Sequence, residues 1–388
     1  MLESALANTS LSDSTAAGEA IGQQISAGLQ GHAPDALIVF ASPRYDYAGL
    51  LAAIQAGCRP ALLVGCSSAG EFTSDVQAEG SVSAVALRSS DIQFTAGVGH
   101  GLRADRAAAA RDLVGSFRGM DDFRYLYRTA LIFTDALAGQ ADDLVAQLTL
   151  LTAGTYQLCG GGAGDDAHFQ KTHVFCGTEA ITDAAVGLEI LSNTPVGIGV
   201  GHGWTPATPA MRVTDAAGMR IASMNATPPA EIFAEHAAHT AQSFDPAAPL
   251  PFFLHNVVGI AGSDGYHLRV PLSIDDAGAA LCAADVPVNS TVHIMCATNE
   301  SAAEAAGAAT RAALQQLAGH TPKVALFFDC VATRLRLGQQ FTAELQTVQR
   351  ELGSVTFAGC NTYGQIARAG GQFSGFHNCT AVVCIIAE

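Results

Sequence analysis

The feature that most constrains the fold of this chain is a segment pattern that occurs three times. Each copy has a short apolar strand, a helical stretch and a second apolar strand that runs into a glycine loop, and each returns in another apolar strand. The first strands read ALIVF, TALIF and VALFF, and they begin at residues 36, 129 and 324; the glycine loops span residues 65–70, 159–164 and 359–364.

Short apolar strands separated by helices of about 10–15 residues indicate βαβ units. The sequence therefore predicts an α/β fold of repeated βαβ units in mixed, largely parallel sheets that are covered on both faces. The length of 388 residues predicts two domains, and a Pro/Thr-rich stretch at residues 205–210 places their boundary near residue 205. Just before it, alternate glycines in residues 197–203 predict a strand that another backbone approaches closely.

The charge of the chain excludes some partners. Its net charge is −16, from 35 acidic and 19 basic residues. A phosphate backbone or an anionic membrane would be repelled, so no nucleic-acid or membrane partner is expected. The N-terminal segment has acids but no Lys or Arg and does not read as a signal peptide. Ten cysteines without a CxxC pair indicate free thiols in a reducing compartment, so a cytoplasmic protein is predicted.

Three ordered motifs carry a resemblance to a known family. The run Leu63–Phe72 (LVGCSSAGEF), the segment Gly201–Trp204 (GHGW) and the run Gly359–Ile366 (GCNTYGQI) resemble the signature of the FIST sensory-domain family. The resemblance implies an N-terminal tail and helix at residues 1–29, a FIST N-like domain at 30–205 and a FIST C-like domain at 206–388. It also implies an intracellular small-ligand sensor in signal transduction.

Within that family, length and architecture are similar to stand-alone haem-binding nitric-oxide sensors. This similarity implies a gas or small-molecule ligand, haem as a cofactor, and a separate signalling protein such as a histidine kinase in a two-component system. Amino acids or similar polar metabolites are the alternative ligands. No spacing of residues in the chain demonstrates haem.

The glycine loops are the predicted ligand site. Glycine tolerates positive φ and lets a ligand approach the backbone, and ligands of open α/β sheets bind at the carboxyl ends of strands. The three loops all follow strands and would line one crevice; the opposing interpretation is that they are turns required by a repeated fold. The predicted ligand-binding residues are Cys66, Ser67, Ser68, Gly70, Gly161, Gly162, Cys360, Asn361, Tyr363 and Gly364.

Catalysis by a cysteine is the competing hypothesis. Cys66 and Cys360 lie beside glycines and would act as thiolate nucleophiles on acyl substrates if a neighbour lowered their pKa. A buried, apolar role for both is favoured because the second loop displaces its cysteine by one position. No catalytic residue is assigned, and the chain is predicted not to be an enzyme.

Histidines supply the candidate haem ligands. His236 and His239 lie three residues apart on a predicted helix, and His377 precedes the final strand near the third loop. A solvated helical face explains His236 and His239 at least as well. No metal other than haem iron is expected.

Overall fold

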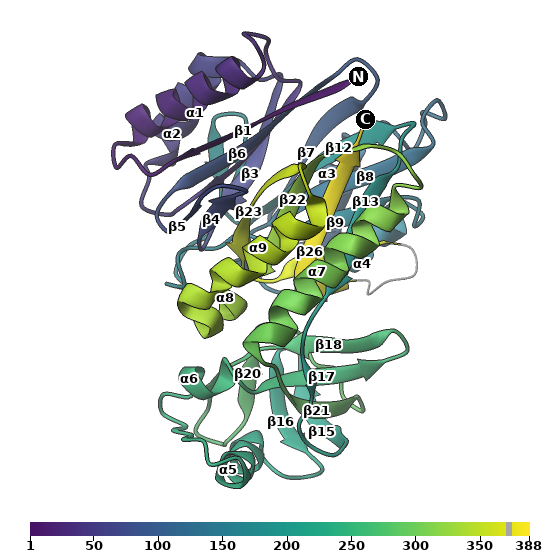
Figure 1. The fold of residues 1–388 in the computed structure, drawn as a ribbon. Helices are drawn as coiled ribbons and strands as arrows, with labels where there is room; N and C mark the ends of the chain where they lie inside the picture. Colours follow the sequence, from purple (N-terminus) through teal and green to yellow (C-terminus); the bar gives the residue numbers. More distant parts are fainter. Residues whose placement is uncertain (370–374) are drawn as a thin grey trace.

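The computed structural model describes residues 1–369 and 375–388 and has a mixed α/β fold, as the sequence predicts (Figure 1). Within the described residues, three mixed sheets of six strands each form the main body, and a further eight-stranded sheet forms a smaller body at one end. Both termini lie at the opposite end of the main body (Figure 1). No helix in this part of the chain is long and apolar enough to cross a membrane.

The three copies of the pattern build the three sheets in the same strand order. The first sheet holds β1 (Leu2–Thr9), β6 (Val82–Ser89), β2 (Ala36–Ala41) and β3 (Leu62–Ser67). The second holds β7 (Gln93–His100), β12 (Ala184–Ser192), β8 (Tyr127–Thr134) and β9 (Gln157–Gly162). The third holds β13 (Val196–Gly201), β26 (Ala381–Ala387), β22 (Pro322–Cys330) and β23 (Thr356–Thr362). We call these segments, with their helices, repeats one, two and three.

One parallel pair occurs in each of these sheets, and the helix between its strands completes a βαβ unit. The pairs are β2 with β3, β8 with β9, and β22 with β23, and the neighbouring strands pair antiparallel. The expectation of largely parallel sheets was therefore wrong in proportion, because each repeat returns in a third strand that runs the other way.

Each repeat lends a hairpin to the sheet of another repeat. The hairpin β4 (Glu71–Thr73) and β5 (Gln77–Ala78) of repeat one pairs with β23 of repeat three. The hairpin β24 (Gln365–Arg368) and β25 (Gly375–His377) of repeat three pairs with β9 of repeat two. The hairpin β10 (Val174–Cys176) and β11 (Glu179–Ile181) of repeat two pairs with β3 of repeat one. The exchange is cyclic, and it ties the three repeats into a closed ring.

Helices cover the outer faces of the sheets, while the inner faces share one core. The covering helices are α1 (Ser14–Gly28), α2 (Tyr47–Cys58), α3 (Arg106–Gly115), α4 (Ala141–Leu151), α7 (Asn299–Gln316) and α9 (Phe341–Leu352). At the centre, Phe40, Phe133 and Phe328 occupy equivalent strand positions and meet edge to face, with ring centroids 5.6 to 5.9 Å apart. Alternation of side chains along each strand separates this shared core from the helix-facing layers.

The predicted close approach at the alternate glycines is confirmed. A Cβ at Gly197 or Gly199 of β13 would lie 2.0 Å from the Ala313 carbonyl oxygen and 1.7 Å from that of Ala309, both in helix α7. Alanine-rich α7 starts with a capping box between Thr298 and Ser301. Small residues on both sides let the helix and strand backbones touch.

An insertion between β13 and α7 forms the smaller body. It holds β14 (Thr205–Pro206), β15 (Met211–Ala217), β16 (Arg220–Met224), α5 (Pro229–His239), α6 (Leu250–Phe253), β17 (Val257–Gly262), β18 (Gly265–Arg269), β19 (Pro271–Ile274), β20 (Ala280–Cys282) and β21 (Thr291–Cys296). Its core includes Phe233, Phe252 and Phe253. The insertion starts at the predicted boundary near residue 205, but residues on both sides of that position share the third sheet.

Residues 1–29 contain the predicted helix, α1, but the expected tail before it is strand β1 of the first sheet. Strand β1 pairs along its whole length with β6, and α1 packs on α2. The short side chains of Ala5 and Ala7 point to a covered face, which gives β1 a weak apolar signal in the sequence. This composition explains why the strand was missed.

Candidate ligand-binding site

The three glycine loops come together, as the sequence predicts. The Ala69 N–H donates to the Asn361 carbonyl oxygen, the Gly164 N–H to that of Ser67, and the Tyr363 N–H to that of Gly162, each over 2.9 Å. The Asn361 N–H also donates to the Gly70 carbonyl oxygen and the Gly162 N–H to that of Gly364, so each loop is bonded to both others. The loops close a ring of main-chain hydrogen bonds at the carboxyl ends of β3, β9 and β23.

Contact between strands explains the first glycine of each loop. A Cβ at Gly65, Gly160 or Gly359 would lie 1.8, 2.1 and 1.7 Å from a carbonyl oxygen of the adjacent parallel strand. A side chain is therefore excluded by the backbone, whatever ligand is present. The turn interpretation accounts for these three glycines.

The predicted site residues lie in different surroundings around this ring. Cys66 and Cys360 are fully buried in the shared core, and burial raises the pKa of the Cys360 thiol well above its usual value. Gly161 and Gly162 pack against the main chain at Gly364 and Tyr363. Core burial of the two cysteines gives no support to nucleophilic catalysis by either.

Several of the predicted hydrogen-bonding side chains are already engaged within the protein. The Ser67 hydroxyl accepts from the His173 N–H over 2.9 Å, and the Ser68 hydroxyl donates to Glu71 over 2.5 Å. The Tyr363 hydroxyl donates to Asp165. Neither side-chain atom of Asn361, which is 1% exposed, has a hydrogen-bond partner among the described residues.

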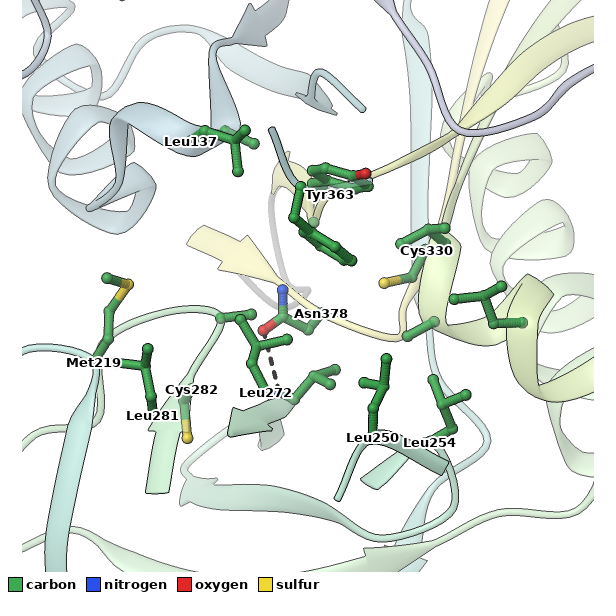
Figure 2. A pocket seen from close by; sticks show the side chains of 18 of the residues that line it. Leu137, Met219, Leu250, Leu254, Leu272, Leu281, Cys282, Cys330, Tyr363 and Asn378 are labelled. Atoms are coloured by element: carbon green, nitrogen blue, oxygen red, sulfur yellow. Dashed lines mark hydrogen bonds between the residues drawn. The ribbon is translucent and has the colours of Figure 1, made fainter. Parts of the chain in front are cut away.

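A cavity of about 190 Å³ opens beside the third loop, between the ring of loops and the insertion. Figure 2 shows Met219, Leu272 and Leu281 of the insertion on one side and Leu137, Tyr363 and Cys330 on the other. The strand ends of repeats two and three form the floor, and the insertion forms the roof. Of the predicted site residues, only Tyr363 and Gly364 line it.

The lining is apolar over most of its surface. Beyond the residues above it consists of Ala136, Gly139, Phe169, Leu250, Leu254, Val270, Cys282, Ala283, Val331, Ala332, Leu335 and Asn378. The rings of Tyr363 and Phe169 stack with centroids 4.5 Å apart, and the Tyr363 hydroxyl is bonded to Asp165, which does not line the cavity. Such a lining suits an apolar molecule with few polar groups.

Cys330 is a lining residue that no sequence motif indicates. This residue ends β22 and precedes the short helix α8 (Val331–Leu337), and its sulfur points into the open space of the cavity (Figure 2). Hydrogen bonds from the Cys379 thiol and from the N–H groups of Cys379 and Ala332 lower the pKa of Cys330 to about 6, although burial acts against them. Because Cys379 is 49 residues away in the chain, no local motif announces this pair.

The buried acids near the loops hold the chain in place. Asp165 accepts N–H bonds from Phe169, Gln170 and Lys171 over 2.7 to 2.8 Å, and Asp135 accepts from the Thr172 hydroxyl and the Asp183 N–H. Among residues 1–369 and 375–388, no group of three or more His, Cys, Asp or Glu side chains could hold a metal ion.

The candidate haem ligands do not converge on the cavity. The His236 ring pairs with the Asn256 side chain over 3.0 Å within the insertion, and His239 is exposed on the same helix. His377 is buried and stacks on His267 with ring centroids 5.3 Å apart. No histidine occurs among the residues that line the cavity in the described part of the chain. These residues do not fit a haem bound there through histidine.

Comparison with known proteins shows the class of protein that this ring and its insertion define. The FIST N domain pattern matches residues 35–227, and the FIST C domain pattern matches residues 229–368. The chain therefore belongs to the FIST family. FIST domains are generally signal-transduction sensor domains for small ligands.

Curated proteins and solved structures add little to this identification. No curated protein matches the chain. A crystal structure of cyanuric acid hydrolase from A. caulinodans is 8% identical, with a TM-score of 0.28 over 100% of this chain and 99% of that one. PurL of T. maritima complexed with FGAR is 11% identical, with a TM-score of 0.24 over 99% of this chain and 72% of that one. At these values neither structure informs on fold or function.

Proposed function

We propose that the protein is a sensor that binds a small, predominantly apolar molecule in the cavity between the ring of loops and the insertion. The observation that carries this proposal is the apolar lining contributed by two bodies, with Leu272 and Met219 facing Leu137 and Tyr363. A ligand held between two bodies favours the arrangement that it contacts best, and so shifts their relative position. A separate signalling protein such as a histidine kinase reads that shift.

Binding at the cavity is tested with Nile red, a neutral apolar dye. We expect saturable fluorescence enhancement by the full-length protein. Leu272→Trp fills part of the cavity and should weaken binding at least about tenfold, or about 1.4 kcal/mol. Leu126→Trp is the matched control, because Leu126 is 72% exposed and lies outside the cavity. Equal affinity of both variants and wild type would refute the site.

Signalling is tested separately with purified histidine kinases from the same genome. Kinase autophosphorylation should change when the sensor is added, and it should change again when a cavity ligand is present. The Leu272→Trp variant should retain the first effect and lose the second. Failure of every such kinase to respond to the sensor would refute this partner class while leaving the binding site intact.

A polar metabolite is the second candidate ligand, and Asn361 favours it. Its carboxamide is buried without a partner, and the Arg334 side chain lies beside it, since a Cβ at Gly70 would contact both at 2.8 and 3.1 Å. Arg334 is itself ion-paired with Glu79 over 2.6 Å. Thermal shift assays with amino acids distinguish the two candidates: a shift that Asn361→Ala abolishes and Leu272→Trp spares would support the polar ligand.

A further inference from the structure

Two cysteines, Cys330 and Cys379, lie in an apolar cluster beside the cavity, and Cys330 lines the cavity itself. We infer that Cys330 and Cys379 form a reactive dithiol that is oxidised by an organic hydroperoxide bound in the cavity. This inference rests on the proposed function, because it assigns a chemical class to the ligand of the same cavity. The structure places a nucleophile, a second thiol and an apolar binding space next to one another.

Cys330 and Cys379 are placed by two neighbouring strands. Cys330 ends β22, and Cys379 lies just before β26, the antiparallel neighbour of β22. Both side chains belong to one apolar cluster with Trp204 and Met295, and they are 3% and 5% exposed. The register of the two strands pairs Phe328 with Val382, which brings the end of β22 alongside the residues just before β26. Bulk solvent is therefore largely excluded, and the cavity is the approach to Cys330.

The pKa values of the two thiols are shifted in opposite directions. The hydrogen bonds to its sulfur lower the pKa of Cys330 to about 6, while its role as donor raises the pKa of Cys379 well above the usual value. These opposite shifts favour ionisation of Cys330 over ionisation of Cys379. Asp329, Arg336 and Glu344 line a small pocket with Cys379, and the charge of Arg336 lowers the pKa of Cys379 while that of Asp329 raises it. A thiolate is the reactive form of cysteine.

Cys282 provides an internal comparison within the same cavity. Its sulfur points away from the open space (Figure 2), and burial raises its pKa to about 12. Two cysteines therefore line one cavity. The Cys330 sulfur faces the open space and its pKa is lowered, whereas the Cys282 sulfur faces away and its pKa is raised. Reaction selectivity between them follows from position and ionisation together.

An organic hydroperoxide is the oxidant that suits both the cavity and the thiols. An apolar lining accepts the organic group of a hydroperoxide and leaves the peroxide oxygens for the thiolate. Attack of Cys330 on the terminal oxygen breaks the O–O bond, forms a sulfenic acid, and releases the alkoxide, which takes a proton and leaves as the alcohol. The Cys379 sulfur then attacks the sulfenic sulfur, its proton leaves with the hydroxyl as water, and a disulfide forms. Two thiols are oxidised for each hydroperoxide reduced.

Cumene hydroperoxide is the test reagent, applied to the full-length protein and followed by thiol titration and mass spectrometry. We expect one equivalent to remove two thiols and to link Cys330 to Cys379 with loss of two hydrogens. Cys379→Ser should stop at a sulfenic acid on Cys330 that dimedone traps. Cys330→Ser should abolish rapid consumption, and Cys282→Ser should behave as wild type. Hydrogen peroxide should react at least about tenfold more slowly, because it lacks the apolar group.

Cumyl alcohol separates failure of this inference from failure of the proposed function. It has the same organic group without the peroxide, and it should displace Nile red from wild type and from all three cysteine variants, which also shows that they are folded. Displacement by the alcohol without oxidation of Cys330 would overturn the dithiol and leave the sensor site standing. Equal rates at Cys330 and Cys282, or with the two peroxides, would also overturn it. A lack of displacement would refute the cavity as the ligand site.

Discussion

Glu71 occupies a position that the repeats share, but it places an ionisable side chain where repeat three has a neutral one. It is fully buried in β4, and its carboxylate accepts bonds from Ser68 and from the Ser81 N–H and hydroxyl over 2.5 to 3.0 Å. The equivalent position of repeat three holds neutral Gln365, which accepts from the Thr380 N–H over 3.3 Å. Burial is the larger effect at Glu71 and raises its pKa from 4.5 to about 7.

Replacing Glu71 by Gln should flatten the pH dependence of stability. Below pH 4.5 the carboxyl is protonated in both states; between pH 4.5 and about 7 the unfolded chain ionises first, so stability is lost as pH rises. The full loss is about 3 kcal/mol. Urea unfolding at pH 5 and pH 8 should show a smaller difference for Glu71→Gln than for wild type. Exposed Glu179→Gln is the control, and an unchanged difference for Glu71→Gln would contradict the assignment.

Pairs of elements, and not single elements, fix the architecture. The sequence predicts the βαβ unit of each repeat well, because strand patterns at residues 36, 129 and 324 and the alanine-rich helix before residue 317 are local signals. It predicts neither the exchange of hairpins nor the weak strand β1, because strand pairing across hundreds of residues leaves no local mark. The meeting of the loops was predictable; the cavity was not, since its roof comes from the insertion.

A methyl group at Gly359 should disrupt the parallel pair of repeat three. Its Cβ would lie 1.7 Å from the Phe327 carbonyl oxygen, so β22 and β23 would have to separate. Gly359→Ala should cost about 3 kcal/mol or more in the free energy of unfolding. Gly115→Ala serves as the control, because nothing lies within 4 Å of that position at the end of α3, and it should change stability by less than about 1 kcal/mol. Similar values for both variants would contradict the close approach.

On the scale of the whole molecule, the main body is one folding unit built from three repeats. Its core contains strand residues from all three, and every repeat completes the sheet of another. The insertion has a core of its own around Phe233. Cooperativity should therefore extend across the repeats and should stop at the insertion.

Phe133→Ala tests this division. Removing one ring of the central aromatic trio should destabilise the main body by about 3–5 kcal/mol. Hydrogen exchange measured by mass spectrometry should show protection lost equally in β2, β8 and β22. Phe233→Ala is the matched variant in the insertion and should leave those three strands protected. Loss of protection confined to β8 would show that the repeats unfold independently.

The insertion makes repeat three differ from repeats one and two, which otherwise share its strand order. Strand ends of the same geometry meet around the whole ring, yet among the described residues only the segment after β13 forms an insertion over them, and the cavity lies beneath it. The chemistry of the cavity is therefore set by the insertion and by the lining residues of the main body that face it. The three repeats determine only where these two linings meet. Replacing the insertion alone would change which class of ligand fits the cavity and would leave the three repeats unchanged.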